Sequence, residues 1–153
     1  MITVKRLSVE ELGILTKLFK YNDVDSMLRE NTEMICSGIM DIFCISKEGK
    51  PIGELRVKYV SDEELYTIKG RRAYLYAFRI NSEFRGRGYG KQLMKYVIDT
   101  LENEGYSEFT IGVGDENKRA KHIYESFGFN KVIARRTETY QGDTYSYTLY
   151  LKS

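Results

Sequence analysis

The segment with the richest chemistry is Arg85-Gly86-Arg87-Gly88-Tyr89-Gly90, followed directly by Lys91. Glycines allow the backbone to turn tightly and to point several N–H groups at one place. The run 73–80 before the segment is rich in strand-forming residues, and the run 91–101 after it has helical periodicity. A helix N-terminus contributes unpaired donors and about half a positive charge. The segment is therefore predicted to bind a phosphate group, with three cationic side chains around it.

A second segment, 117–129, combines a helical pattern with polar residues that could do chemistry. At about 100° per residue its apolar face includes Ala120 and Tyr124, whereas His122 falls on the opposite, solvent side. Tyr124 could be a core aromatic or a phenol that faces a site. Asn117 could be a helix N-cap or a ligand contact. His122, the single histidine, is expected to be exposed and is not expected to be a base.

The elements that must position these segments can be read from the spacing of apolar residues. Strands are predicted over 2–7, 42–46, 52–60, 73–80, 109–113, 132–139 and 144–151, and helices from Ser8 onward and over 24–35, 91–101 and 117–127. Ser8 followed by Glu11 is a capping-box pattern. The residues Gly112 and Gly114 indicate a bulge or a close backbone approach. The order β, α, α, three strands, α, β, α, β, β predicts a mixed sheet with helices on both faces.

Composition limits the class of protein. The 153 residues are expected to form one domain, 1–153, and the apolar fraction of 42% is that of a globular chain. A net charge of +2 gives no reason to expect nucleic acid as a partner. The N-terminus lacks the apolar region of a signal peptide, and no apolar run is long enough to span a bilayer, so a cytoplasmic protein that does not act at a membrane is expected. Cys36 and Cys44 suit buried thiols in a reducing compartment, with a disulfide the less favoured alternative.

The two segments together resemble the signatures of the GCN5-related N-acetyltransferase (GNAT) superfamily. Arg85-x-x-Gly88-x-Gly90 is similar to the family's pyrophosphate loop, Arg/Gln-x-x-Gly-x-Gly/Ala. The second signature is similar to Asn117-x-x-Ala120-x-x-x-Tyr124-Glu125-x-x-Gly128-Phe129. The order of elements agrees from end to end. The resemblance implies the GNAT fold, a mixed α/β (α+β) architecture in which a mostly antiparallel sheet of six to seven strands is flanked by about four helices.

The resemblance also implies an activity, the transfer of an acetyl group from acetyl-CoA to a primary amine in a ternary complex, without a metal. Holding a thioester beside a neutral amine is largely an orientation problem. The pyrophosphate would be bound by the loop, that is by Arg85, Gly86, Arg87, Gly88, Tyr89, Gly90 and Lys91. The pantetheine arm would be bound by strand residues Phe78, Arg79 and Ile80, one of whose N–H groups would polarise the thioester carbonyl. Ala120 would also bind the cosubstrate, and Asn117 would contact the pantetheine or an ordered water near it. Tyr124 would protonate the departing thiolate, since phenol and thiol acidities differ by only about 1.5 units.

The general base is harder to assign. Many family members carry an acidic residue on the strand before the pyrophosphate loop, but 75–80 contains none. Glu54 on the preceding strand is the first candidate and Tyr76 the second. The alternatives are a solvated strand charge for Glu54 and a packing role for Tyr76. Water without a dedicated base would suffice for an amine of low pKa.

The acceptor is expected to be a small-molecule or peptide amine. The early helices and the closing hairpin, which bound the acceptor cleft in the family, carry the polar and acidic residues Asn22, Asp23, Asp25, Glu30, Glu33, Glu138, Tyr140 and Asp143. An acidic lining would favour a cationic amine, while a solvated charged face is the alternative. A homodimer is one expected assembly, by analogy with other members of the family.

Two rival functions remain at this stage. The first is a GNAT-fold module that binds acyl-CoA as a sensor without turnover, which the missing strand carboxylate motivates. The second is RNA binding by the Arg-Gly segment. Arginine–glycine segments that bind RNA are long and repeated, whereas this one is single and lies between two ordered elements.

Overall fold

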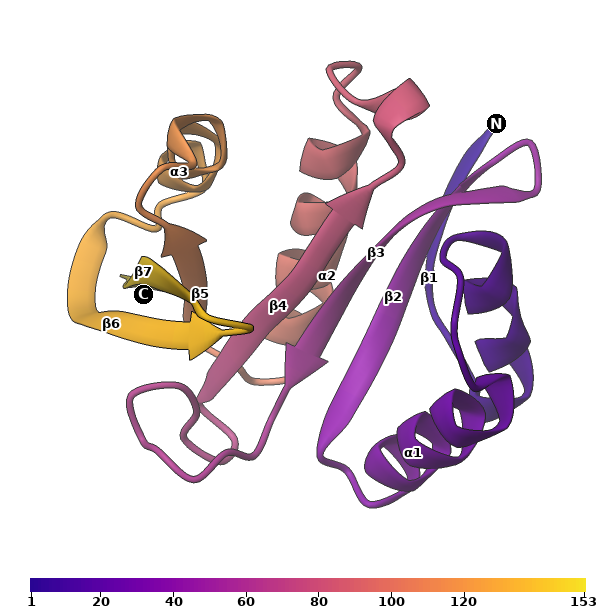
Figure 1. The fold of residues 1–153 in the computed structure, drawn as a ribbon, viewed down its shortest axis with the longest axis horizontal. Helices are drawn as coiled ribbons and strands as arrows, with labels where there is room; N and C mark the ends of the chain where they lie inside the picture. Colours follow the sequence, from indigo (N-terminus) through magenta and orange to yellow (C-terminus); the bar gives the residue numbers. More distant parts are fainter.

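The computed structural model describes residues 1–153, except for the side chain of Tyr140. Its strands are Ile2–Arg6 (β1), Met40–Lys47 (β2), Lys50–Lys58 (β3), Arg72–Ile80 (β4), Glu108–Gly114 (β5), Lys131–Tyr140 (β6) and Asp143–Lys152 (β7). They form a seven-stranded sheet in the order β1-β2-β3-β4-β5-β7-β6 (Figure 1). Neighbouring strands are antiparallel except β4 and β5, which are parallel. The expectation of a mixed, mostly antiparallel sheet is confirmed.

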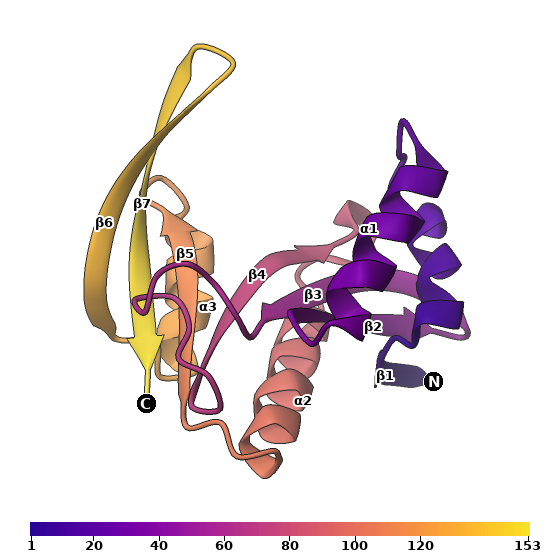
Figure 2. The same cartoon turned by 90° about the horizontal axis from the view of Figure 1, so that it is seen from below.

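Helices cover both faces of the sheet, as expected. They are Val9–Lys17 (η1, a 3₁₀ helix), Val24–Cys36 (α1), Ser82–Phe84 (η2, a short 3₁₀ helix), Tyr89–Asn103 (α2) and Lys118–Ser126 (α3). Leu12 and Leu15 of η1 and Met27 of α1 pack against Ile42 of β2 on one face. On the other face, α2 and α3 share a larger core with β2, β3, β4 and β5. Figure 2 shows α1 and α2 on opposite sides of the sheet.

Local sequence explains where the helices begin. The Glu11 carboxylate accepts a hydrogen bond from the Ser8 amide at 3.0 Å, the return half of a capping box. The Asp23 side chain accepts from the Ser26 amide at 3.0 Å at the start of α1. The first helix is a nine-residue 3₁₀ helix, which is longer than is usual for this form. It contains Gly13, which lowers α-helix propensity, and the Thr16 hydroxyl donates to the Gly13 carbonyl three residues back at 2.7 Å.

A bulge in β4 decides which of its side chains face which side. Glu54 is paired with Arg79 and Arg56 with Tyr76, so that three steps on β4 oppose two on β3. The extra residue is Ala77, whose φ of 50° is uncommon for a residue with a side chain. Because of the bulge, Tyr76 and Arg79 lie on the face of η1 and α1.

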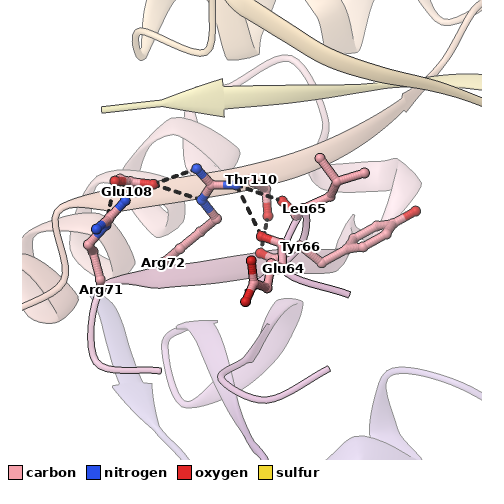
Figure 3. A network of polar contacts seen from close by, with 7 residues as sticks. All are labelled: Glu64, Leu65, Tyr66, Arg71, Arg72, Glu108 and Thr110. Atoms are coloured by element: carbon pink, nitrogen blue, oxygen red, sulfur yellow. Dashed lines mark hydrogen bonds and ion pairs between the residues drawn. The ribbon is translucent and has the colours of Figure 1, made fainter. Parts of the chain in front are cut away.

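A polar network joins the parallel ends of β4 and β5 (Figure 3). Arg72 and Glu108 lie opposite each other in the register, and Arg72 Nε donates to Glu108 Oε1 at 2.7 Å. Arg71 Nε donates to Glu108 Oε2 at 2.8 Å. Burial raises the pKa of Glu108, but these hydrogen bonds outweigh burial and hold the pKa below its usual value. The hydroxyl of Thr110 on β5 donates to the Tyr66 carbonyl at 2.8 Å, which fixes the loop before β4 to the same strand end.

One sequence expectation about the thiols is wrong. Cys44 is buried, but Cys36 lies exposed at the end of α1, where the helix leaves the core. Both thiols are free, so the disulfide alternative is excluded. No helix in the described chain has the length and apolar character needed to cross a bilayer.

Candidate active site

Strands β4 and β5 are joined at one end only. Their pairing covers Arg72–Leu75 and Glu108–Ile111, whereas β4 continues to Ile80 and β5 to Gly114. Figure 1 shows the two strands separating beyond the paired end. Backbone donors and acceptors of 76–80 on that edge of β4 are therefore available to a ligand that lies between the strands.

The glycine-rich loop has the conformation that its sequence predicts. Gly86 and Gly88 have φ of 77° and 85°, in the left-handed region where glycine is favoured. Gly88 is the N-cap of α2, and its carbonyl accepts the first helical hydrogen bond, from the Gln92 amide at 3.1 Å. The amides of the first turn of α2, before Gln92, have no helical partner and carry the positive end of the helix dipole. Arg85 Nε donates to the Ile80 carbonyl at 2.9 Å and so ties the loop to the end of β4.

Gly90 lets α2 approach β4 closely. A Cβ atom at this position would lie 3.1 Å from Phe78 Cζ, tighter than most Cβ contacts. The first turn of α2 is thus placed directly against the part of β4 that lies beyond the pairing with β5.

The second predicted segment lies across the gap on α3. The Asn117 side chain accepts a hydrogen bond from the Ala120 amide at 3.0 Å, so Asn117 is the N-cap of this helix. Tyr124 is only 8% exposed and packs in the core, with ring centroids 6.1 Å from Phe78 and 6.3 Å from Phe129. Burial raises the pKa of Tyr124 to about 12, so the phenol stays protonated at neutral pH.

A cavity of about 690 Å³ lies between these elements, within the size range of sites for small molecules and cofactors. It is lined by the end of β4, by η2 and the glycine loop, by the first turn of α2 and by α3. The lining residues, all in the described part of the chain, include the cationic side chains of Arg85, Lys91 and Arg119 and no Asp or Glu; Arg79 also borders the cavity, but its guanidinium is bonded to Glu54. The full set is Phe78, Arg79, Ile80, Phe84, Arg85, Gly86, Gly88, Tyr89, Gly90, Lys91, Asn117, Arg119, Ala120, His122, Ile123 and Tyr124. A pocket of this charge suits an anionic ligand with an apolar portion.

The cavity brings together every residue predicted to bind the cosubstrate except Arg87, whose guanidinium lies 5.9 Å from the ring centroid of Phe84. Sequence reasoning missed four lining residues. Ile123 lies three residues after Ala120 and four after Arg119 on α3, a helical spacing that could have indicated both. Phe84 precedes the loop and carried no signal. His122 is exposed, as expected, but also contributes to the rim.

Glu54 lies on the opposite face of the sheet and is completely buried. Its Oε1 accepts from Arg56 Nε at 2.8 Å, and its Oε2 accepts from Arg79 Nη2. Arg56 Nη1 also donates to Asn31 Oδ1 of α1 at 3.2 Å. The alternative that Glu54 is a solvated strand charge is therefore wrong, because η1 and α1 cover this end of β3. Its role as a base stays a prediction.

A row of tyrosines continues from Glu54 across the same face. Tyr76 is half-buried, stacks on Tyr74 with 5.5 Å between ring centroids, and lies beneath Lys58 Nζ at 5.3 Å. Burial raises the pKa of Tyr76. Further along, the hydroxyls of Tyr66 and Tyr147 are 2.8 Å apart. Tyr147 also donates to Glu138 at 3.3 Å, so an acidic residue of the hairpin does reach this row.

The other residues expected to line an acceptor cleft remain predictions. Asp23 caps α1, and the side chain of Tyr140 lies outside what the structure describes. The rest are exposed: Asn22, Asp25, Glu30, Glu33, Glu138 and Asp143. Among the described residues, no group of three or more His, Cys, Asp and Glu side chains is arranged to hold a metal ion.

Comparisons with known proteins point to one family. Residues 12–129 match the acetyltransferase (GNAT) family. The chain is 35% identical over 85 residues to the thialysine N-epsilon-acetyltransferase of Bos taurus, covering 55% of this chain and 50% of that protein. It thus spans about half the length of the curated relatives that it matches.

Solved structures share the fold over almost the whole chain. Mutant forms of the spermidine/spermine N-acetyltransferase of Vibrio cholerae superpose with a TM-score of 0.78 at 18% identity, covering 99% of this chain and 93% of that one. A GNAT family acetyltransferase from Elizabethkingia anophelis, solved with acetyl-CoA bound, has a TM-score of 0.71 at 15% identity, covering 99% and 97%.

Proposed function

The chain belongs to the GNAT family of acetyltransferases, and we propose that it transfers an acetyl group from acetyl-CoA to a primary amine. The observation that carries the proposal is the cavity of about 690 Å³, because both sequence signatures meet in it. Its cationic lining and glycine nest suit a pyrophosphate, and Phe78, Ile80 and Ile123 suit the less polar arm.

In this proposal the loop residues hold the pyrophosphate of acetyl-CoA. Gly86 and Gly88 direct backbone N–H groups inward, and Arg85, Lys91 and Arg119 neutralise charge. The pantetheine arm follows the free edge of β4 beyond Leu75. Binding energy from the distant end then serves to place the thioester where β4 and β5 separate.

An N–H group of β4 near the bulge polarises the thioester carbonyl and stabilises the oxyanion as the amine attacks. The position of the strand separation supports this step. The cavity lies on the side of Phe78 and Ile80, whereas Tyr76 and Arg79 point to the other face, from which the amine approaches. Tyr124, protonated at neutral pH, donates a hydrogen bond and then a proton to the departing thiolate.

Glu54 is the first candidate for the base and Tyr76 the second. Both Glu54 oxygens already accept bonds from guanidinium groups, so Glu54 must exchange one of these bonds to take a proton. If Glu54 is the base, Glu54→Gln lowers kcat by about 10²- to 10⁴-fold for amines that are charged at the assay pH. Amines of low pKa are already neutral and should lose much less. An equal loss for both kinds of amine would instead indicate a structural role.

The acceptor class is an amine on a small molecule or a peptide. The proteins that resemble this chain in sequence or fold are named for different acceptors, among them thialysine, the alanine of ribosomal protein bS18, and spermidine or spermine. The likeness to these proteins supports the reaction type more than any one acceptor.

Thermal unfolding with acetyl-CoA, followed by a thiol-release screen of amines, tests the proposal. At about 100 times its dissociation constant a ligand stabilises by about 2.7 kcal/mol, which raises the Tm measurably. Acetyl-pantetheine, which lacks the pyrophosphate, is the matched control and should stabilise far less. Stabilisation without turnover on any amine would favour a sensor of acyl-CoA, and no stabilisation would refute the site.

A further inference from the structure

Two guanidinium groups converge on one buried carboxylate on the face from which the amine approaches. Glu54, which is completely buried, accepts from both Arg56 and Arg79. Two arginines and one glutamate leave an excess of one positive charge. Lys58, over the Tyr76 ring at 5.3 Å, adds another on the same face. The two arginines compensate the charge of the buried carboxylate, but the three side chains together still carry a net positive charge.

Arg79 is the member of this group that can reach a ligand. Its guanidinium lies 3.6 Å from the ring centroid of Phe19, so the planar group is stacked and its orientation is held. Its side chain is 47% exposed, and the residue also lines the cosubstrate cavity. One of its five N–H groups is used by Glu54, which leaves further donors on a fixed, partly exposed fork.

A buried hydroxyl beside the arginines supports the same conclusion. The Tyr21 oxygen is buried and makes no hydrogen bond of good geometry among the described residues, although Arg56 lies close enough to donate to it, and its own proton has no acceptor. Burial and Glu54 raise the pKa of Tyr21, whereas Arg56 and Arg79 lie close enough to lower it. A buried hydroxyl whose proton has no acceptor is uncommon and is satisfied if a ligand supplies one.

We propose that Arg79, held by Glu54 and Phe19 and assisted by Arg56 and Tyr21, binds a carboxylate on the acceptor, so that the preferred substrates carry both an amine and a carboxylate. This inference rests on the proposed acetyl transfer. A guanidinium fork matches a carboxylate geometrically, and the excess positive charge of Arg56, Arg79 and Lys58 over Glu54 disfavours acceptors with several amines and no anion near Arg79, whereas Glu138 lies further along the tyrosine row. Glu54 is then a positioning residue for Arg79, whether or not it also takes a proton.

Matched pairs of acceptors test the inference without any mutation. L-lysine, β-alanine and glycylglycine are each compared with their carboxamides by thiol release, with rates expressed per neutral amine because the amide lowers the amine pKa. The carboxylate forms should have kcat/KM higher by about 10- to 100-fold for at least one pair, the range of a charge-assisted hydrogen bond. Calorimetric binding of the same pairs is measured in parallel.

Variants then assign the preference to Arg79. Arg79→Gln should remove it mainly by raising KM for the carboxylate form, and Arg79→Lys, which keeps the charge but loses the fork, should retain part of it. Arg29→Gln is the control, because Arg29 is exposed on α1 and donates only to Ser26 Oγ at 3.2 Å in the described contacts. If turnover occurs without a carboxylate preference, or if the preference survives Arg79→Gln, the inference is wrong although acetyl transfer stands. If no amine is acetylated, the calorimetric data decide: tighter binding of the carboxylate forms than of their carboxamides would support the Arg79 site, and equal binding would overturn the inference.

Discussion

Replacing Tyr124 by phenylalanine removes one oxygen from the cavity and keeps the ring that packs on Phe78 and Phe129. The packing is conserved, so we expect the Tm to change by about 3 °C or less. Acetyl-CoA affinity should also change little, because in the proposed mechanism the hydroxyl acts only when negative charge develops on the leaving sulfur.

The magnitude follows from the pKa of Tyr124, which burial raises to about 12. A thiol has a pKa of about 8.5, so full proton transfer to a free thiolate is uphill by about 3.5 units, or about 5 kcal/mol. Tyr124 therefore contributes to the rate mainly as a hydrogen-bond donor to the developing thiolate, before the proton transfer that completes the step. Removal of one such donor costs about 10²- to 10³-fold in kcat, less than the upper end for a general acid.

The assay combines steady-state thiol release with calorimetric affinity for acetyl-CoA. Tyr150→Phe is the matched control, because Tyr150 is 7% exposed and belongs to the same core but does not line the larger cavity. Since the phenol ionises only near pH 12, the ratio of wild-type to variant rates should stay constant from pH 7 to about pH 10. A loss of affinity as large as the loss of kcat, a loss of kcat below about threefold, or a ratio that collapses near pH 9 would refute the reasoning.

Three further changes test the loop, the sheet and the network in Figure 3. Gly88→Glu, at φ 85°, should abolish stabilisation by acetyl-CoA in thermal unfolding, because it strains the N-cap and adds an anion to the phosphate nest; unchanged stabilisation would exclude the loop as the binding site. Gly53→Ala should cost about 1–3 kcal/mol in urea unfolding, since its Cβ would lie 2.5 Å from Ile80 Cδ1 and 2.7 Å from the Arg79 carbonyl; a neutral result would show that β4 yields easily. Glu108→Gln should lower the free energy of unfolding at pH 7. The difference from the wild type should fade as the pH drops below about 4.3, because the stabilisation from a carboxylate with a lowered pKa is lost as the pH falls through the pKa of the folded state. A difference in stability that persists at pH 2 would mean that the charge of Glu108 is not its cause.

The proposed cosubstrate site was largely predictable from the sequence because its parts are local. The glycines of the loop need no long-range information to adopt positive φ, and helical periodicity predicts a helix over 91–101 after the loop and another over 117–127 within the second signature. The N-cap of α3 was also predictable, since Asn117 bonds to an amide three residues away. Phe84 was not predicted to line the cavity because no motif around it indicates a site. Arg87 was predicted from its charge and its place in the loop, but neither of these determines the direction in which its guanidinium points.

Glu54 shows the limit of the same reasoning. Alternation along β3 could place its side chain on one face, but only the packing of η1 and α1 makes that face buried. The bond to Arg79 depends on the bulge at Ala77, which changes the phase of β4. The residue types around Ala77 do not predict a bulge, since alanine rarely adopts the positive φ that it has here.

The sequence by itself determined the local structure: a glycine-rich turn, the helix that follows it, a capped helix that carries Tyr124, and a mixed sheet. Local propensity and periodicity are sufficient for these, since each depends on residues a few positions apart. Only the tertiary structure decided that β4 and β5 separate beyond Leu75, that both signatures line one cavity, and that Arg79 joins Arg56 at Glu54 behind it. Those outcomes depend on strand register and on contacts between segments 20 or more residues apart, such as Arg79 and Glu54 at a separation of 25.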